Sequence, residues 1–383
     1  LSIFFLLNLT TATHYPEPWI DEVLYIDPAI NLAEGNGFTS SAWTSQTKDE
    51  FWVSNTPLYA LLEAGWIKVF EPSLIVTRTF SYLLALLSGI FLSIGIKNFQ
   101  LIRSLKIRNS CIAFLFMIFP VVYTYRMGRP DILNLLLASS TFLAVSFAPS
   151  KLRNTLLIFS SLLTPFASLA LVFYILTLLC LGLLFFGKKI LKDAALIIVG
   201  ISLGVLLMLG FYLVNDSLEK FLMITVGSAH TLLGQITQYF ILDNDRILEK
   251  FTEFPWRYLE ALIWWPSTSL MMFAAYLLLL VPKINRNQIN YFFILSIISV
   301  PLILLFIGKY SWHYSWMHIS ILGIGIFYSI DRLDWHKHAI VLRSCTIPLF
   351  LSALIGFPMI IGITFYEWDE RSRGPIQSFA EKH

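Results

Sequence analysis

Long apolar runs recur along the chain, and they constrain its fold more than any other feature. Several approach the roughly 20 residues that a helix needs to cross a bilayer, and they lack the alternation of a membrane β-strand. Of the 383 residues, 57% are hydrophobic and 13% are charged, whereas soluble chains carry about 25% charged residues. Because the backbone must satisfy its own hydrogen bonds in lipid, we predict an all-α polytopic membrane protein.

The apolar runs predict about eleven transmembrane helices. The opening run LSIFFLLNL is only about half a span long, so we expect the chain to begin inside its first transmembrane helix. A signal peptide is the weaker alternative, because no basic segment or small-residue cleavage site accompanies the run. The fifth and sixth spans share one stretch that is broken near Thr164–Pro165, and a single long kinked helix is the alternative there. The ten later spans are expected at 74–96, 110–125, 131–148, 154–167, 168–187, 194–214, 259–281, 290–307, 314–330 and 343–366.

Basic residues gather in one set of short loops, and the positive-inside rule makes that face cytoplasmic. The outer face then holds the long segments 10–73 and 215–258, the C-terminal tail and most of the carboxylates. The net charge of +3 is too small to indicate a nucleic-acid partner. The basic residues on the cytoplasmic side are Lys97, Arg103, Lys106, Arg108, Lys151, Arg153, Lys188, Lys189, Lys192, Lys283, Arg286, Arg332, Lys337 and Arg343.

The outer segment 10–73 contains two amphipathic stretches, WIDEVLYIDPAINLAEGNGF and PLYALLEAGWIKVF. Pro18 suits the first turn of the first helix, the Gly35–Gly37 pair is expected to end it, and Pro57 opens the second. We predict two helices that lie in the membrane interface. Their expected anchors in the interface are Trp19, Trp43, Trp52 and Trp66.

Two adjacent acids, Asp21 and Glu22, begin the first of these helices. Acids in a first turn stabilise the helix dipole by about 0.3–1 kcal/mol, which is one explanation of the pair. A carboxylate at the outer membrane boundary can also act as a general base toward an acceptor hydroxyl, or bind a divalent cation. Neighbouring residues on a helix point about 100° apart, so the two acids can serve different groups.

The order of these motifs resembles the membrane glycosyltransferases of the GT-C fold. The resemblance consists of the acid pair, the turn Gly35-Asn36-Gly37-Phe38, the stretch TPLYALLEAGWIKVF and then Arg78. It is greatest toward the protein O-mannosyltransferase-like and aminoarabinose-transferase-like branch. It implies an inverting glycosyltransferase that takes a sugar from a polyprenyl-phosphate carrier and passes it to a lipid, glycan or protein acceptor on the extracytoplasmic side.

The resemblance also implies the site residues. Asp21 takes the catalytic role with Glu22 beside it, and the second outer loop, YRMGRPD, supplies Arg126, Arg129 and Asp131. Arginine suits phosphate because its planar fork matches the oxygens. An Arg129–Asp131 surface pair that caps the next helix is the alternative, and for Arg78 the alternative is snorkelling to the interface. The candidate catalytic residues are Asp21, Glu22 and Asp131, and the candidate substrate-binding residues are Tyr25, Arg78, Arg126, Arg129, Lys309, His313 and Tyr314.

A later outer turn, GKYSWHYSWMH, places Lys309 and Tyr314 where the aminoarabinose-transferase-like branch has a Gly-Lys followed by a Tyr. Lys309 would hold the lipid phosphate as a point charge. The chain departs from many members of the resembled family before the second interfacial helix. Those members have His-Pro-Pro or Lys-Pro-Pro there, whereas this chain has Asn55-Thr56-Pro57. That difference removes a charged or metal-binding group, so no cofactor is assigned and a divalent cation stays an open alternative.

The predicted function is sugar transfer by single displacement, with Asp21 as base and with Arg129 and Lys309 holding the phosphate. No Walker loop is present, and a phosphate-linked sugar needs none because it carries its own leaving group. We expect residues 1–366 to form the membrane domain and 367–383 to begin an extracytoplasmic tail, in a bacterial inner membrane. A transporter or lipid flippase is the alternative, which would need charges near the bilayer midplane and two related halves; a non-catalytic scaffold is a third class.

Overall fold

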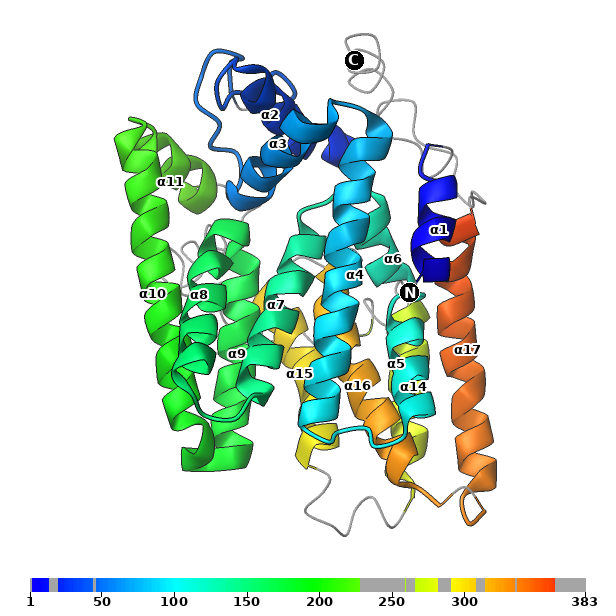
Figure 1. The fold of residues 1–383 in the computed structure, drawn as a ribbon. Coiled ribbons are helices and arrows are strands. Elements are labelled where there is room, and N and C mark those ends of the chain that lie inside the picture. Colours follow the sequence, from blue (N-terminus) through cyan, green and yellow to red (C-terminus); the bar gives the residue numbers. More distant parts are fainter. Residues whose placement is uncertain are drawn as a thin grey trace.

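The computed structural model describes residues 2–13, 20–43, 46–227, 259, 266–281, 291–307, 314–334 and 336–361. Within these ranges the chain is mostly helical and forms no strand, apart from one isolated bridge between Thr39 and Phe51. Most helices run side by side, and α2, α3 and α11 lie at one end, which is the upper end in Figure 1. The helices are α1 (Ser2–Thr10), α2 (Ile20–Glu34), α3 (Leu58–Phe70), α4 (Leu74–Asn98), α5 (Leu105–Leu115), α6 (Phe119–Arg126), α7 (Asp131–Ser146), α8 (Lys151–Ala167), α9 (Leu169–Phe186), the 3₁₀ turn η1 (Gly187–Ile190), α10 (Leu191–Val214), α11 (Leu218–Gly227), α14 (Pro266–Leu279), α15 (Tyr291–Ile307), α16 (Trp316–Arg332) and α17 (Ala339–Ile361).

The described residues include helices that are long and apolar enough to cross a membrane. Three stretches meet that condition, Leu74–Asn98, Leu169–Val214 and Ala339–Gly356, and the bent pair α5–α6 makes a fourth if it is one span. The second stretch contains both α9 and α10, which η1 joins. Shorter apolar helices accompany them. The all-α membrane class is therefore supported, and the count of about eleven spans stays a prediction.

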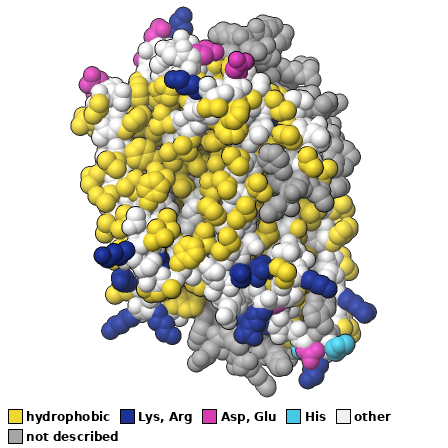
Figure 2. Space-filling model, viewed as in Figure 1, with side chains coloured by type: hydrophobic (Ala, Val, Ile, Leu, Met, Phe, Trp, Pro, Cys, Tyr) yellow, Lys and Arg dark blue, Asp and Glu magenta, His cyan; other side chains and the backbone are white. Residues whose placement is uncertain are grey.

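The surface has the banded character that a bilayer requires. Figure 2 shows a wide apolar band, with most Lys and Arg side chains near its lower end and most Asp and Glu side chains near its upper end. Large apolar side chains in this band are exposed, among them Leu184 at 80% and Leu206 at 65%. Exposed apolar area of this extent is typical of a surface in contact with lipid.

The helix limits in the described ranges follow the predicted spans at several places. The predicted span 74–96 is α4, 131–148 is α7, 194–214 is α10 and 290–307 is α15, each within a few residues. The stretch 154–187 forms two helices, because Ser168 is extended and its hydroxyl accepts from the backbone N–H of Ala170 to cap α9. Residues 260–265 and 362–366, at the ends of two other predicted spans, lie outside the described residues.

The predicted span over 110–125 is not one straight helix. The chain breaks after Leu115, and α5 and α6 meet at an angle of 61°. Pro120 lies in the first turn of α6, where its missing N–H needs no helical partner, and the N-cap residue Ile118 is extended. The break exposes the carbonyl of Phe116, which accepts a hydrogen bond from the Tyr125 hydroxyl at 3.1 Å.

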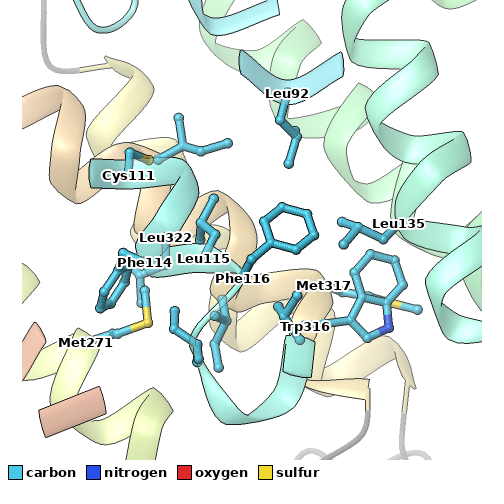
Figure 3. Close-up of a cluster of buried hydrophobic side chains, with 14 of the residues drawn as sticks. Leu92, Cys111, Phe114, Leu115, Phe116, Leu135, Met271, Trp316, Met317 and Leu322 are labelled. Carbon is cyan, nitrogen blue, oxygen red and sulfur yellow. The ribbon is translucent and has the colours of Figure 1, made fainter. Parts of the chain in front are cut away.

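Two packing features surround this bend. Gly356 of α17 lies against it so closely that a Cβ there would stand 2.0 Å from the carbonyl oxygen of Met117. Beside it, apolar side chains of α4, α5, α7, α14 and α16 form a buried cluster with Phe116 of the bend, which includes Met271 and Trp316 (Figure 3). The bend is thus held by packing from later parts of the chain.

The outer segment forms the two expected helices, α2 and α3. Gly35 and Gly37, with φ of 85° and 89°, follow the end of α2 in a conformation that favours glycine. The Asp27 carboxylate then organises the return, because it accepts hydrogen bonds from the Ser40 hydroxyl at 2.7 Å and from the backbone N–H of Ser41 at 2.7 Å. Pro18 and Trp19 lie outside the described residues.

The prediction that Trp52 anchors this segment in the interface is wrong. Its side chain is fully buried in a cluster with Phe38 and with apolar residues of α2 and α3. Phe38 and Trp52 meet edge to face with ring centroids 5.2 Å apart. Trp52 therefore belongs to a small core that the outer segment forms for itself, which gives α2 a firm support.

The close contact between α8 and α10 gives a testable prediction. A Cβ at Gly204 would stand 2.2 Å from the carbonyl oxygen of Leu162, whereas one at Gly210 of the same helix meets nothing within 4 Å. We expect Gly204→Ala to destabilise the protein by about 1–3 kcal/mol through overpacking. Gly210→Ala, the matched control, should leave thermal stability in detergent unchanged or slightly raised, and equal stability of the two variants would contradict this packing.

Candidate functional site

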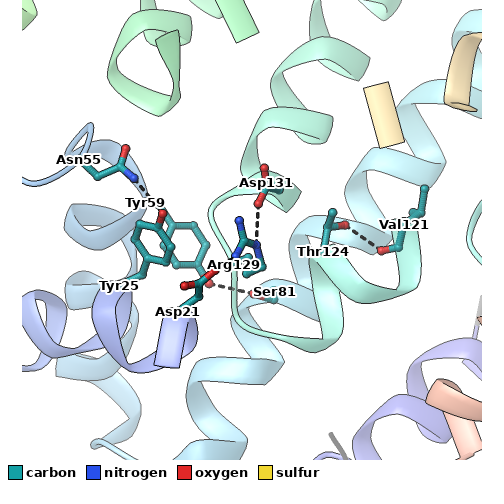
Figure 4. A network of polar contacts seen from close by, with 9 residues as sticks. All are labelled: Asp21, Tyr25, Asn55, Tyr59, Ser81, Val121, Thr124, Arg129 and Asp131. Carbon is teal, nitrogen blue, oxygen red and sulfur yellow. Dashed lines mark hydrogen bonds and ion pairs between the residues drawn. The ribbon is translucent and has the colours of Figure 1, made fainter. Parts of the chain in front are cut away.

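Three charged side chains from separate parts of the chain meet at the end of the bundle where α2 and α3 lie. Asp21 lies in the first turn of α2, Arg129 in the short loop between α6 and α7, and Asp131 at the start of α7. Arg129 Nε donates to Asp131 Oδ2 at 2.9 Å, and Arg129 Nη1 pairs with Asp21 Oδ2. Figure 4 shows the guanidinium between the two carboxylates. We call these three residues the acid–arginine cluster.

Burial differs within the acid–arginine cluster. The side chains of Arg129 and Asp131 are each 3% exposed, but that of Asp21 is 28% exposed. Burial lowers the pKa of the Arg129 guanidinium, but the negative charges of Asp131 and Asp21 together have a larger effect and raise this pKa overall. Arg129 therefore stays protonated, and Asp21 is the member of the cluster that a ligand can reach.

These exposures bear on the alternative interpretation of Arg129 and Asp131. A surface pair would be largely exposed, whereas this pair is buried. Asp131 does begin α7, but Pro130 at the N-cap makes no side-chain capping bond. The pair thus holds the loop to the helix inside the protein.

A further ion pair, Glu22–Arg78, lies next to the acid–arginine cluster. Arg78 of α4 donates to both oxygens of Glu22, from Nε at 2.8 Å and from Nη2 at 2.7 Å, and its Nη1 donates to the carbonyl of Ala12 at 2.6 Å. The two side chains are 0% and 1% exposed, so Arg78 does not snorkel. A bidentate pair of this kind fixes both distance and angle. It sets the position of the first turn of α2, which carries Asp21.

Glycine at position 128 is required by both its backbone and its surroundings. Its φ is 55°, in the left-handed region. A Cβ there would stand 2.9 Å from Oε1 of Glu22. The loop that carries Arg129 therefore packs directly on the Glu22–Arg78 pair, so that this pair and the acid–arginine cluster form one structural unit.

Arg126 lies in the same stretch of sequence but binds α1. Its Nη1 donates to Asn8 Oδ1 at 3.0 Å and to Thr11 Oγ1 at 2.8 Å, and its guanidinium lies 5.7 Å from the Tyr82 ring centroid. These contacts tie the end of α1 to α6.

Two phenols face the acid–arginine cluster. Tyr25 follows Asp21 by one helical turn, and Tyr314 precedes α16; each lies close enough to Arg129, Asp21 and Asp131 to interact with them electrostatically. Burial raises the pKa of Tyr25, so its hydroxyl stays protonated at neutral pH. The structure thus brings Asp21, Tyr25, Arg129, Asp131 and Tyr314 together. Lys309 and His313 lie outside the described residues.

No cation site is evident in the described part of the chain. No group of three or more His, Cys, Asp or Glu side chains there could hold a metal ion. His318, buried on α16, contacts the hydroxyl of Thr268 on α14 at 3.2 Å. The divalent cation stays an open alternative.

Sequence reasoning missed two polar residues beside this site, Asn55 and Glu63. Asn55 donates to the Tyr25 hydroxyl at 2.8 Å. Glu63 of α3 is fully buried, and neither of its carboxyl oxygens has a hydrogen-bond partner among the described residues. The helical spacing of Tyr59, Glu63 and Ile67 placed Glu63 on the buried face and could have revealed it. The hydrogen-bond partner of Asn55, Tyr25, lies 30 residues away in the sequence, so no local sequence pattern predicts this contact.

No known protein family matches the chain, and no curated protein or solved structure matches it at a significant level. Any functional conclusion therefore has to come from the residues and their arrangement.

Two ion pairs of this segment that differ in burial, Glu22–Arg78 and Glu50–Lys220, give a second prediction. Glu22→Gln leaves Arg78 buried without its counter-charge, which costs about 3–5 kcal/mol. Glu50→Gln is the matched control, because Glu50 pairs with Lys220 where both side chains are partly exposed. Thermal unfolding in detergent should show a large loss for Glu22→Gln and little change for Glu50→Gln. A loss of similar size in both variants would contradict the structural role of the Glu22–Arg78 pair.

Glu63 gives a third prediction. Burial, and then the nearby Glu22, raise the pKa of Glu63 well above its ordinary value of 4.5. Above pH 4.5 the carboxyl of Glu63 is ionised in the unfolded chain but still protonated in the folded protein. The folded state therefore loses stability relative to the unfolded state as pH rises above 4.5, and the contribution of Glu63 is complete only at lower pH. Glu63→Gln should therefore unfold at a higher temperature than the wild type at pH 8. Near pH 4 the two should be alike, and a difference that does not depend on pH would refute the assignment.

Proposed function

We propose that this protein is an inverting membrane glycosyltransferase of the GT-C type, which uses a polyprenyl-phosphate-linked sugar as donor. The acceptor is a hydroxyl of a lipid, glycan or protein. The proposal includes about eleven spans, a location in a bacterial inner membrane and a site at its extracytoplasmic face. A non-catalytic scaffold would have no use for a reachable carboxylate held within a buried charged cluster.

The observation that carries the proposal is the position of Asp21. It is the accessible carboxylate of a cluster whose other members are buried, and Arg129 holds it in place. It lies in α2, at the end of the bundle that is above the apolar band of the surface in Figures 1 and 2. A base at this boundary can meet both a polar acceptor and the headgroup of a lipid-linked donor.

The reaction follows from these groups. The acceptor oxygen attacks the anomeric carbon from the side opposite the phosphate, while its proton passes to an Asp21 oxygen. The bond between the anomeric carbon and the phosphate oxygen breaks, and its electron pair leaves with the polyprenyl phosphate. Arg129 orients Asp21 through one nitrogen and is itself fixed by Asp131 through another. A positioned base of this kind contributes about 10²–10⁴-fold to the rate.

Arg129 takes a different part from the one that the sequence predicted. Asp131 and Asp21 pair with its Nε and Nη1, so a phosphate at this guanidinium would compete with an aspartate. In this proposal Arg129 first positions Asp21, and Lys309 remains the candidate for the phosphate. Glu22 and Arg78 support the first turn of α2, and Tyr25 and Tyr314 face the donor.

The test is a transfer assay with the full chain in membranes. A panel of short-chain polyprenyl phosphates, each carrying a labelled hexose or pentose, is supplied, and the release of polyprenyl phosphate is measured. We expect turnover with at least one donor, and Asp21→Asn should lower kcat by about 10²-fold or more.

Glu34→Gln is the matched control, because Glu34 is an exposed carboxylate at the other end of α2. It should keep wild-type turnover. Full turnover in Asp21→Asn would remove the assignment of the base. If no donor reacts and vesicles containing the protein move a labelled lipid or sugar across the bilayer, the transporter alternative replaces the proposal.

A further inference from the structure

Asn55 lies just before α3 and makes hydrogen bonds through both ends of its side-chain amide. Its side-chain Oδ1 accepts a hydrogen bond from the backbone N–H of Thr56 at 2.7 Å, and its Nδ2 faces the Tyr25 hydroxyl at 2.8 Å. A backbone N–H can only donate, so the atom opposite it must be the amide oxygen. The other atom is then the NH₂ group, and the orientation of this amide is determined by its partners.

Asn55 is also held rigidly by its neighbours. Its own carbonyl accepts from the Tyr212 hydroxyl of α10 at 2.9 Å, and the hydroxyl of Thr56 donates to the carbonyl of Ala167, at the end of α8, at 2.8 Å. Two helices that flank the outer segment therefore fix this turn. The amide cannot rotate without breaking contacts on both sides.

The orientation of the Asn55 amide determines which hydrogen bonds the Tyr25 hydroxyl can make. Because the NH₂ group donates to its oxygen, the phenol must direct its own proton elsewhere. No second hydrogen-bond partner for this hydroxyl is found in the part of the chain that the structure describes. Tyr25 lies one turn from Asp21 on the same face of α2, and it interacts electrostatically with Arg129 first and then with Tyr314, Asp21 and Asp131. In Figure 4, Asn55 approaches Tyr25 from the side away from Asp131.

We propose that Asn55 is a positioning residue that sets the hydrogen-bond polarity of Tyr25, so that the phenol proton is donated to an oxygen of the sugar phosphate bound beside Asp21. This inference rests on the proposed function and separates two roles within it. Asp21 accepts a proton, and Tyr25 supplies a hydrogen bond without losing one. Burial keeps the pKa of Tyr25 raised, which suits a group that donates and does not ionise.

The variant Asn55→Asp tests this directly, because it exchanges one atom. The oxygen that accepts from Thr56 remains, while the NH₂ donor becomes a carboxylate oxygen at the same place. Tyr25 would then donate to the new carboxylate, and its proton would be withdrawn from the ligand. In the transfer assay we expect kcat/KM for the short-chain donor to fall at least about tenfold, the contribution of a single hydrogen bond.

Tyr25→Phe should show the same loss, and the double variant should show no further loss, because both changes remove one interaction. The fall should appear when the donor is titrated and not when the acceptor is titrated. Asn98→Asp is the matched control, since Asn98 donates to the Ser146 hydroxyl at 3.0 Å in an exposed contact on the opposite end of the bundle. It should leave kcat/KM unchanged.

A second measurement does not depend on activity. The tyrosine doublet in Raman difference spectra, taken between each protein and its Tyr25→Phe counterpart, reports whether a phenol accepts or donates. Tyr25 should change from acceptor to donor when Asn55→Asp is introduced. Wild-type kcat/KM in Asn55→Asp, with Asp21→Asn inactive, overturns the inference and leaves the proposed function standing. If no donor reacts, the proposed function fails, and an unchanged doublet then overturns the inference about Asn55 as well.

Discussion

Buried pairing of arginine with carboxylate is the constraint on which the outer end of this protein depends. Moving a guanidinium or a carboxylate out of water costs roughly several kcal/mol, unless an opposite charge and hydrogen bonds compensate the loss of hydration. Arg78 and Arg129 are compensated only when α2, α4 and the loop before α7 adopt one arrangement. The ion pairs therefore specify geometry as much as they add stability, and they hold Asp21 where a ligand can reach it.

The outer segment and the helical bundle depend on each other. The segment has a small apolar core of its own around Trp52, and it also packs apolar side chains such as Tyr59 against the bundle. Polar contacts attach it as well: Glu22 to Arg78, Asp21 to Arg129 and Thr56 to the end of α8. Polar contacts of this kind are directional, so they place side chains more accurately than apolar packing alone. Such accuracy is what a proton transfer between a carboxylate and a hydroxyl requires.

The sequence predicted many of the helices, and it singled out residues that the structure brings together. Apolar run length located α4, α7, α10 and α15, and the resemblance singled out Asp21, Arg129 and Asp131, which lie in contact. The bend after Leu115 could not be read from the sequence, because the apolar composition continues across the break. Trp52, Asn55 and Glu63 were missed or misjudged because their surroundings come from distant parts of the chain. Local patterns describe one helix face, whereas burial and partners are set by the whole fold.

The contact of Gly356 with the bend has a consequence for how the protein is assembled. The helices of a membrane protein emerge from the ribosome in order, so α5 and α6 are made long before α17. The close approach of α17 to the Met117 carbonyl, which leaves no room for a side chain at position 356, can form only after α17 has been made. The bend between α5 and α6 thus reaches its final packing later than the helices on either side of it, once α17 has joined the bundle.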